Sequence, residues 1–190
     1  MLFASRNRHK LAEVRAILGP GILSTDDLPN LPHIEETEDT FIGNAVLKAR
    51  GLALASGLWT LADDSGLEVD ALHGEPGVQS AYYAGRHATD ADNLHKLVES
   101  MRGVSNRAAR FRCALALSSP TGETSVIIAT CEGRLADAPR GANGFGYDPL
   151  FIPDGHTETF AELPPETKNA LSHRARALAA AKREWAKELP

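Results

Sequence analysis

Apolar residues recur at helical spacing in four stretches of the chain. A first helix is predicted directly after the polar loop 5–8, and Gly19-Pro20 ends it. A second helix is expected from about residue 39 to residue 56, and a third over residues 89–101 with Thr89 as its cap. The last helix begins near Ser172, and its buried side carries Ala175, Leu178 and Trp185.

The second predicted helix presents two different faces. Its core stripe consists of Ile42, Ala45, Val46, Ala49, Leu52 and Ala53. Phe41, Asn44 and Lys48 share another face, because residues three, four and seven positions apart lie above one another on a helix. These three side chains could therefore address a ligand together.

Strand-like runs lie between the helices. Short apolar strands are expected at residues 2–4 and 59–62, and a half-buried strand with alternating polarity at 67–71. Two long runs, 111–117 and 125–131, predict an antiparallel hairpin. The chain has no repeat, low-complexity stretch or obvious linker. This mixture of elements predicts an α/β fold in which a mixed sheet is flanked by helices.

Composition narrows the classes of function. The 190 residues carry a net charge of -5 with Lys and Arg scattered, which argues against binding to nucleic acid or to a membrane surface. The start of the chain is too soon polar for a signal peptide, and no apolar run approaches the ~20 residues of a membrane helix. A cytoplasmic soluble protein is expected. Cys113 and Cys131 are interpreted as buried free thiols.

Two segments in the first forty residues could bind charged groups. The strand, polar loop and helix at residues 2–18 place Asn7 and Lys10 near a helix N-terminus, where anions bind, although the loop is not a Walker A sequence. The stretch 35–39 is acidic and directly precedes the second predicted helix, where negative charge is favourable. By itself, the first segment is better explained as an ordinary structural turn, and the second as a solvated charge run.

The sequence Asp63-Asp64-Ser65-Gly66 follows a predicted buried strand. Two adjacent carboxylates repel each other unless a cation or a shared proton relieves them. Carboxylate oxygens are hard ligands, so Mg²⁺ is the natural partner. The alternative is an Asx turn that only ends the strand.

Two later segments could recognise a nucleotide. In the glycine-rich loop 141–149, Phe145 and Tyr147 offer aromatic faces for a base, and Asp148 could accept hydrogen bonds from a base edge. Lys168 precedes His173 and Arg174, which are expected in the first turn of the last helix. A glycine-rich surface loop and a basic surface patch are the structural alternatives.

Together these segments resemble, in order and spacing, the inosine/xanthosine triphosphate pyrophosphatases, also called Ham1-like proteins. The resemblance covers nearly the whole chain. Its most specific parts are ADDSGLEVDAL at residues 62–72, PGV at 76–78, GFGYDPLF at 144–151 and SHR at 172–174. NAVLKA at 44–49 and FAEL at 160–163 also fit.

The resemblance implies an enzyme that cleaves a purine nucleoside triphosphate (ITP, dITP, XTP or dXTP) to the monophosphate and pyrophosphate. It implies one domain over residues 1–190, with two lobes, an elongated mixed sheet and a central cleft, and it implies a homodimer. It also implies Mg²⁺ bound by Glu35 and Asp64, with Asp64 as the general base. The cellular role that it implies is the removal of deaminated purines from the nucleotide pool.

The remaining implied roles are contacts to substrate. The phosphates are expected at the loop formed by Ser5, Arg6, Asn7, Arg8, His9 and Lys10. Lys48 would steady the triphosphate, and Ser65 would also contact substrate. The base is expected against Phe145, with Gly146, Tyr147 and Asp148 along its edge. Further base and phosphate contacts would come from Lys168, His173 and Arg174.

The sequence departs from the family pattern at two positions. Arg6 stands where the family usually has a glycine in a Thr-Gly-Asn loop, and Tyr82 stands where it usually has an arginine. Two other functions are compatible with parts of the sequence: a nucleotide sensor on the same scaffold, and a different metal-dependent phosphohydrolase that releases orthophosphate. A sensor would have little need for Asp64, and a phosphohydrolase for monophosphates would leave Phe145 and Tyr147 unexplained.

Overall fold

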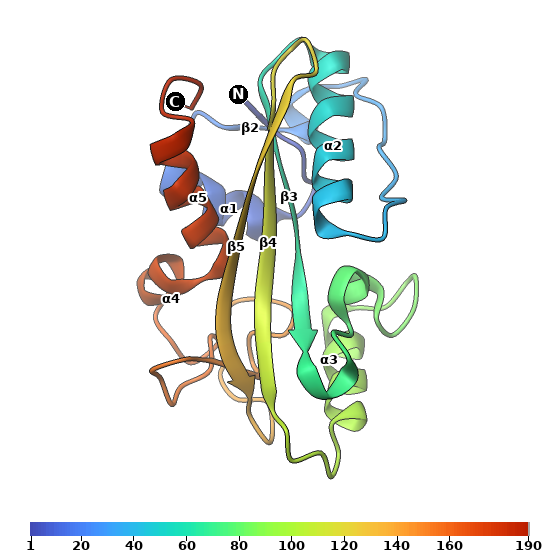
Figure 1. Cartoon of the computed structure of the whole chain (residues 1–190), viewed down its shortest axis with the longest axis vertical. Coiled ribbons are helices and arrows are strands. Elements are labelled where there is room, and N and C mark those ends of the chain that lie inside the picture. Colours follow the sequence, from blue (N-terminus) through green and yellow to red (C-terminus); the bar gives the residue numbers. More distant parts are fainter. Residues whose placement is uncertain (190) are drawn as a thin grey trace. The chain divides into compact units, whose positions relative to one another are not determined.

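A mixed sheet of six strands, in the order β2-β1-β3-β4-β5-β6, forms the framework of the protein (Figure 1). The computed structural model describes residues 1–189. Strand β1 pairs in parallel with β2 and β3, whereas β5 and β6 are antiparallel. The predicted α/β fold with a mixed sheet and flanking helices is therefore confirmed. The strands are β1 (Leu2–Phe3), β2 (Leu23–Ser24), β3 (Thr60–Val69), β4 (Ala108–Ser118), β5 (Thr124–Leu135) and β6 (Phe151–Pro153).

The contacts of the chain divide it into two compact units. The first unit contains Met1–Asp64, Cys113–Ala129 and the chain from Arg174 on. The second contains Ser65–Arg112 and Thr130–His173. Strands β3, β4 and β5 each contribute residues to both units. The interpretation of residues 1–190 as one domain of two lobes stays a prediction.

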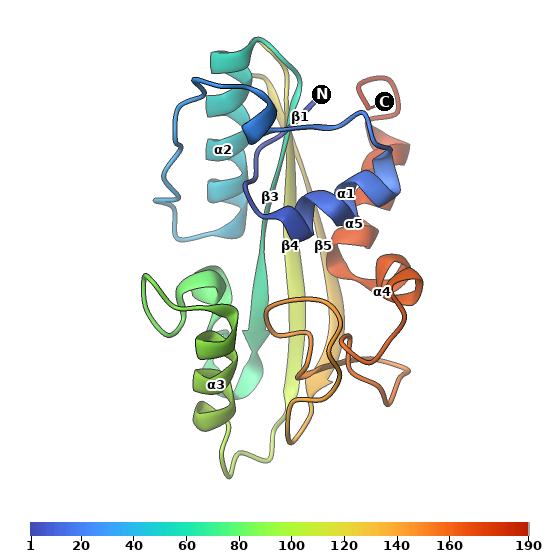
Figure 2. The same cartoon turned by 180° about the vertical axis from the view of Figure 1, so that it is seen from behind.

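In the first unit, helices cover both sides of the strands (Figures 1 and 2). Helices α1 (Arg8–Leu18) and α5 (His173–Glu184) lie on one side and α2 (Phe41–Ser56) lies on the other. The helices α1 and α5 share an apolar core with the strands. This core contains Phe3, Val14, Leu18, Ile22, Leu61, Cys113, Leu115, Leu117, Ile127, Ala177, Leu178, Ala181 and Trp185.

Helix α2 has the predicted extent, but part of its predicted core stripe is wrong. Ile42 is 42% exposed, whereas the ligand-facing set of Phe41, Asn44 and Lys48 is buried. Burial of two polar side chains is tolerated because each finds partners: Asn44 bonds to the backbone of Glu38, and the Lys48 ammonium donates to a backbone carbonyl and to carboxylates. The pattern of polarity therefore places Ala45, Ala49, Leu52 and Ala53 in the core correctly, but it misplaces Ile42 and does not indicate that Asn44 and Lys48 are buried.

The second unit is built around an aromatic core. It contains α3 (Asp90–Ser100), the short helix α4 (Pro165–Leu171) and two 3₁₀ segments, Asp70–Leu72 and Gly77–Tyr82. The ring centres of Phe111 and Phe151 are 4.8 Å apart, and those of Phe151 and Phe160 are 5.1 Å apart. As predicted, Thr89 caps α3 by accepting a hydrogen bond from the Asp92 N–H.

Two strand predictions differ from the structure. Residues 59–62 and 67–71 were expected as separate strands, but β3 runs without interruption from Thr60 to Val69. The expected strand end at Asp63-Asp64 is therefore wrong, and both carboxylates lie inside a strand. The predicted hairpin is confirmed, since β4 and β5 are neighbours joined by residues 119–123. Helix α4 and the short strands β2 and β6 were not predicted. Across residues 1–189, no helix is long and apolar enough to cross a membrane.

Candidate active site

The loop before α1 presents exposed polar groups at the first turn of that helix. The Asn7 Oδ1 atom accepts hydrogen bonds from the N–H groups of His9 (2.9 Å) and Lys10 (3.1 Å), so Asn7 caps α1. Its amide oxygen is thus used within the protein, which leaves only its amide nitrogen to donate to a ligand. Ser5 is half-buried, while Arg6, Arg8 and His9 are exposed with Asn7. Arg6, Arg8 and His9 of the predicted phosphate loop therefore lie at the surface, whereas Lys10 is directed toward Asp63.

Asp63 is buried at the centre of a network of charges. Its carboxylate accepts hydrogen bonds from Lys10 Nζ (2.6 Å), Arg174 Nε (2.9 Å) and Cys113 Sγ (3.1 Å). Arg174, itself 1% exposed, also pairs with Glu13. Burial opposes ionisation of Asp63, but Arg174 and Lys10 outweigh it and hold the pKa of this carboxyl well below its usual range. Asp63 is therefore ionised at neutral pH, and its contacts join α1, β4 and α5.

Asp64 has the opposite environment. Successive side chains of a strand point to opposite faces, so Asp64 faces α2 rather than α1 and α5. Its Oδ1 atom lies 3.4 Å from Lys48 Nζ, and its Oδ2 atom is buried without a hydrogen-bond partner among residues 1–189. Burial raises the pKa of Asp64, an effect that Lys48 and Lys10 only partly offset. This carboxylate is poised to accept a proton or bind a cation.

Lys48 connects Asp64 to the acidic stretch before α2. Its ammonium donates to Glu36 Oε1 at 2.6 Å and to the Asp63 carbonyl oxygen at 2.9 Å. Burial favours the neutral amine, yet Asp64 and Glu36 raise the pKa of Lys48 above its usual value. Lys48 is thus a cation that the protein already surrounds with oxygen atoms.

In the acidic stretch 35–39, Glu36 rather than Glu35 contacts Lys48 beside Asp64. The Glu35 side chain is exposed and makes no hydrogen bond or ion pair with residues 1–189, whereas Glu36 contacts Lys48. Among the described residues, no three His, Cys, Asp or Glu side chains are arranged to hold a metal ion. A Mg²⁺ ion usually needs only one or two protein carboxylates together with substrate phosphates. The unpaired Asp64 Oδ2 fits that requirement.

A separate cluster in the second unit contains the predicted base-binding residues. Lys168 Nζ lies 2.6 Å from Asp148 Oδ2 and 4.8 Å from the centre of the Phe145 ring. Asp148 Oδ2 also accepts a hydrogen bond from the Phe145 N–H at 2.8 Å. Gly144 is required here, because a Cβ at this position would lie 2.0 Å from that same oxygen. The structure therefore brings together Phe145, Asp148 and Lys168.

Other residues of the glycine-rich loop form hydrogen bonds to neighbouring elements of the second unit. The Tyr147 hydroxyl donates to the Ser80 carbonyl oxygen at 2.8 Å, and burial raises the pKa of Tyr147. The Gly146 N–H donates to Asp90 Oδ2 at 2.9 Å. Ser65, which follows Asp64 in β3, is half-buried. The loop is thus fastened to α3 and to the 3₁₀ segment Gly77–Tyr82.

His173 and Arg174 are adjacent but belong to different clusters. The His173 ring stacks on Phe111 in the second unit, with 4.8 Å between ring centres and 12° between planes. Arg174 belongs to the first unit, where its guanidinium is engaged with Asp63 and Glu13. A direct contact from Arg174 to substrate stays a prediction.

The sequence patterns do not indicate two members of the Asp63 cluster. Glu13 lies three residues after Lys10 on α1, and this helical spacing was its only signal. The alternation around Cys113 predicts a buried thiol, which is confirmed, but not its hydrogen bond to Asp63. Both contacts join residues far apart in the sequence.

These features define a mixed α/β protein whose first unit holds a buried carboxylate, with one oxygen unpaired, beside a buried lysine. The chain matches the model of the Ham1 family over residues 1–184 and belongs to that family. It is 46% identical over 190 residues to the dITP/XTP pyrophosphatase of Geobacillus kaustophilus, covering 97% of this chain and 93% of the relative. It is 49% identical over 181 residues to the dITP/XTP pyrophosphatase of Rhodospirillum centenum, covering 92% and 89%.

Solved structures agree with this assignment. A Ham1 protein from Coxiella burnetii matches with a TM-score of 0.89 and 41% identity, over 98% of each chain. A nucleoside-triphosphatase, dITP/XTP pyrophosphatase, from Mycobacterium abscessus matches with a TM-score of 0.76 and 47% identity, over 94% of this chain and 96% of the other. The α/β fold is thus that of the family.

Proposed function

We propose that this protein hydrolyses the non-canonical purine nucleotides ITP, dITP, XTP and dXTP to the monophosphate and pyrophosphate. Relatives that are 46% and 49% identical to it over nearly their whole length are dITP/XTP pyrophosphatases. Its role is then the removal of deaminated purines from the nucleotide pool. On the basis of the family resemblance, we also propose that the protein is a homodimer and is located in the cytoplasm.

The observation that carries the proposal is the state of Asp64. Its Oδ2 atom is buried and lacks a hydrogen-bond partner among residues 1–189, and burial raises its pKa. A carboxylate in this state accepts a proton readily, so Asp64 acts as the general base. It takes a proton from water as the water oxygen attacks the α-phosphorus. The bond from that phosphorus to the bridging oxygen breaks, and pyrophosphate leaves with the electron pair.

The cofactor in this proposal is Mg²⁺, held by Asp64 together with the acidic segment. The family resemblance favours Glu35 as the second ligand, whereas Glu36 is the side chain that contacts Lys48 beside Asp64. When bound, the ion supplies positive charge to the phosphate oxygens. Lys10 and Lys48 add charge from the protein itself and orient the triphosphate.

The residues of the second unit are proposed to recognise the base. Phe145 offers the stacking surface, and Gly146, Tyr147 and Asp148 offer polar groups for the base edge. Lys168 and His173 complete these contacts. Donors that meet a 6-oxo group reject the 6-amino group of adenine, because a buried donor would then face another donor.

The test is to incubate the purified protein with Mg²⁺ and, separately, ITP, XTP, GTP or ATP, and to identify the products by phosphorus NMR. Monophosphate and pyrophosphate from ITP and XTP, with little product from GTP or ATP, are expected. Orthophosphate as the first product would replace the proposal by another phosphohydrolase. Nucleotide binding without turnover would replace it by a sensor.

A further inference from the structure

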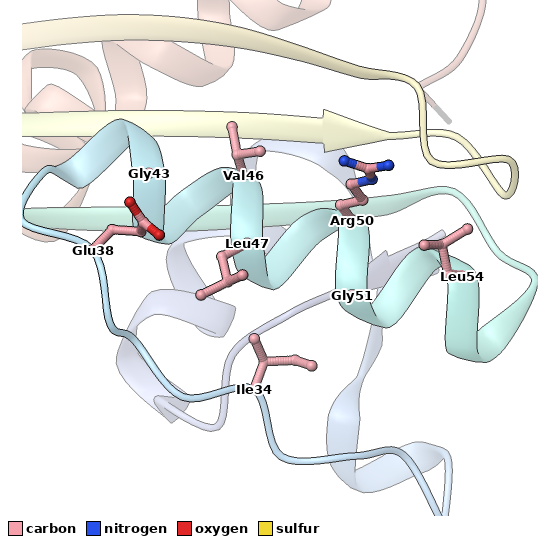
Figure 3. A pocket seen from close by; sticks show the side chains of 8 residues that line it. All are labelled: Ile34, Glu38, Gly43, Val46, Leu47, Arg50, Gly51 and Leu54. Atoms are coloured by element: carbon pink, nitrogen blue, oxygen red, sulfur yellow. The ribbon is translucent and has the colours of Figure 1, made fainter.

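Residues 34–38, here called the acidic segment, run alongside α2 and pack against it at two glycines (Figure 3). A Cβ on Gly51 would lie 2.8 Å from the Ile34 side chain, so the missing side chain makes room for Ile34. A Cβ on Gly43 would lie 2.6 Å from Glu38 Cβ. The two ends of the segment therefore sit directly on the helix.

Packing under the segment is incomplete. A pocket of about 440 Å³ lies along the same face of α2 and is lined by Ile34, Glu38, Gly43, Val46, Leu47, Arg50, Gly51 and Leu54. Figure 3 shows the side chains of Ile34 and Leu47 directed toward each other across it. Because close packing does not fix the segment along its length, specific hydrogen bonds gain importance in holding it.

Asn44 supplies those bonds. Its Oδ1 atom accepts a hydrogen bond from the Glu38 N–H at 3.0 Å, and its Nδ2 atom donates to the Glu38 carbonyl oxygen at 3.1 Å. The side chain is only 1% exposed, so water does not compete for either bond. One buried amide thereby fixes both backbone groups of Glu38.

The two hydrogen bonds between Asn44 and Glu38 lie next to the proposed metal site. Asn44 and Lys48 are one helical turn apart on α2, and Lys48 contacts both Glu36 and Asp64. We propose that Asn44 is a positioning residue that holds the acidic segment beside Asp64, so that carboxylates of both can bind one divalent cation. This inference rests on the proposed function and adds to it a residue that does not itself touch the ion.

Mn²⁺ is the probe, and its binding is followed by electron paramagnetic resonance with the non-hydrolysable α,β-methylene analogue of ITP present. Asn44→Ala should weaken Mn²⁺ binding by about 10–100-fold, the usual effect of losing a residue that orients metal ligands. The Glu38 amide should also exchange its hydrogen faster. Asn44→Leu, which keeps more of the side-chain volume, serves if the alanine variant fails to fold.

Asn93 provides a matched control. It is 2% exposed, accepts a hydrogen bond from the Ala84 N–H at 2.8 Å and donates to the Ala81 carbonyl oxygen at 3.0 Å. Asn93→Ala loses the same two kinds of bond, so it should share any general loss of stability while keeping normal Mn²⁺ affinity. Equal effects of the two alanine variants on Mn²⁺ binding would overturn the inference.

Asp64→Asn separates this inference from the proposed function. If Asp64→Asn weakens Mn²⁺ binding and Asn44→Ala does not, the metal site stands and the positioning role of Asn44 is wrong. If Asp64→Asn binds Mn²⁺ as tightly as the wild type does, the metal assignment itself fails, and the inference fails with it.

Discussion

The surroundings of the adjacent aspartates Asp63 and Asp64 in β3 shift their pKa values in opposite directions. Asp63 meets Arg174 and Lys10, which keep it ionised, whereas burial raises the pKa of Asp64. Two carboxyl groups whose surroundings drive their pKa values apart can take different roles in one site. At the scale of single residues, this contrast supports the proposed role of Asp64 as the general base.

Asp64→Asn should abolish turnover, because an amide cannot accept the proton from water. Nucleotide binding measured by calorimetry should be largely retained. Wild-type kcat/KM should fall as the pH drops through the raised pKa of Asp64, since the base must be ionised. Near-normal turnover by the variant would remove Asp64 from the role of base.

The same substitution should stabilise the fold at neutral pH. When a carboxyl group has a higher pKa in the folded than in the unfolded protein, the free energy of unfolding decreases as the pH rises. The decrease runs from the unfolded-state pKa, 3.8, up through the folded-state pKa. Asn imitates the neutral form, so the variant should have the larger free energy of unfolding at pH 7. Urea denaturation should show this advantage disappearing below pH 3.8. A loss of stability at pH 7 would mean that the contact with Lys48 outweighs burial.

Phe145→Ala tests the stacking role in the second unit. The loss of a base–aromatic stack costs ~1–3 kcal/mol, so KM for ITP should rise by about 5–150-fold while kcat changes little. Steady-state kinetics supply both values. Unchanged KM would place the base elsewhere.

At the scale of elements, Asp63 connects segments that are distant in sequence. Lys10 and Glu13 come from α1, Cys113 from β4 and Arg174 from α5. These contacts hold α1 and α5 against the strands of the first unit in addition to their shared apolar core. The network also fixes Lys10 near the first turn of α1, where the phosphates are expected.

Asp63→Asn should destabilise the protein by about 3–5 kcal/mol at pH 7, because it leaves Arg174 and Lys10 without their buried counter-charge. The wild-type advantage should persist on acidification and decline only below pH 3.8, since the folded pKa lies well under that value. Urea denaturation across pH measures both effects. Glu99→Gln, which breaks an exposed pair with Arg102, is the control and should cost less than about 1 kcal/mol. Equal losses in both variants would contradict the structural role of Asp63.

Sequence patterns predict some elements better than others. The extents of α1, α2 and α3 follow from period and caps, because those signals are local. The continuity of β3 cannot be predicted from local signals, because the sequence Asp63-Asp64-Ser65-Gly66 is typical of a turn. These residues stay extended because buried cations satisfy Asp63, and because Gly66 admits close contact with Ser80 Oγ, which would lie 2.3 Å from a Cβ there.

At the scale of the molecule, β3, β4 and β5 run through both compact units. Unfolding either unit would fray the strands of the other, so the two should unfold in one transition. The chain's two tryptophans, Trp59 and Trp185, both lie in the first unit. Tryptophan fluorescence and far-UV circular dichroism should therefore give the same urea midpoint. Separate midpoints would show that the units unfold independently.

The sequence by itself determined the α/β class, the main helices, the long hairpin and the family, because these depend on local periodicity and on motifs that are contiguous in the chain. Only the tertiary structure decided which acidic side chain meets Lys48, that Arg174 is committed to Asp63, and that Asn44 clamps Glu38. Each of these contacts joins residues whose spacing in sequence carries no such signal. Their pairing depends on burial, which makes an unmatched charge or amide costly and so selects the partner that tertiary packing brings within reach.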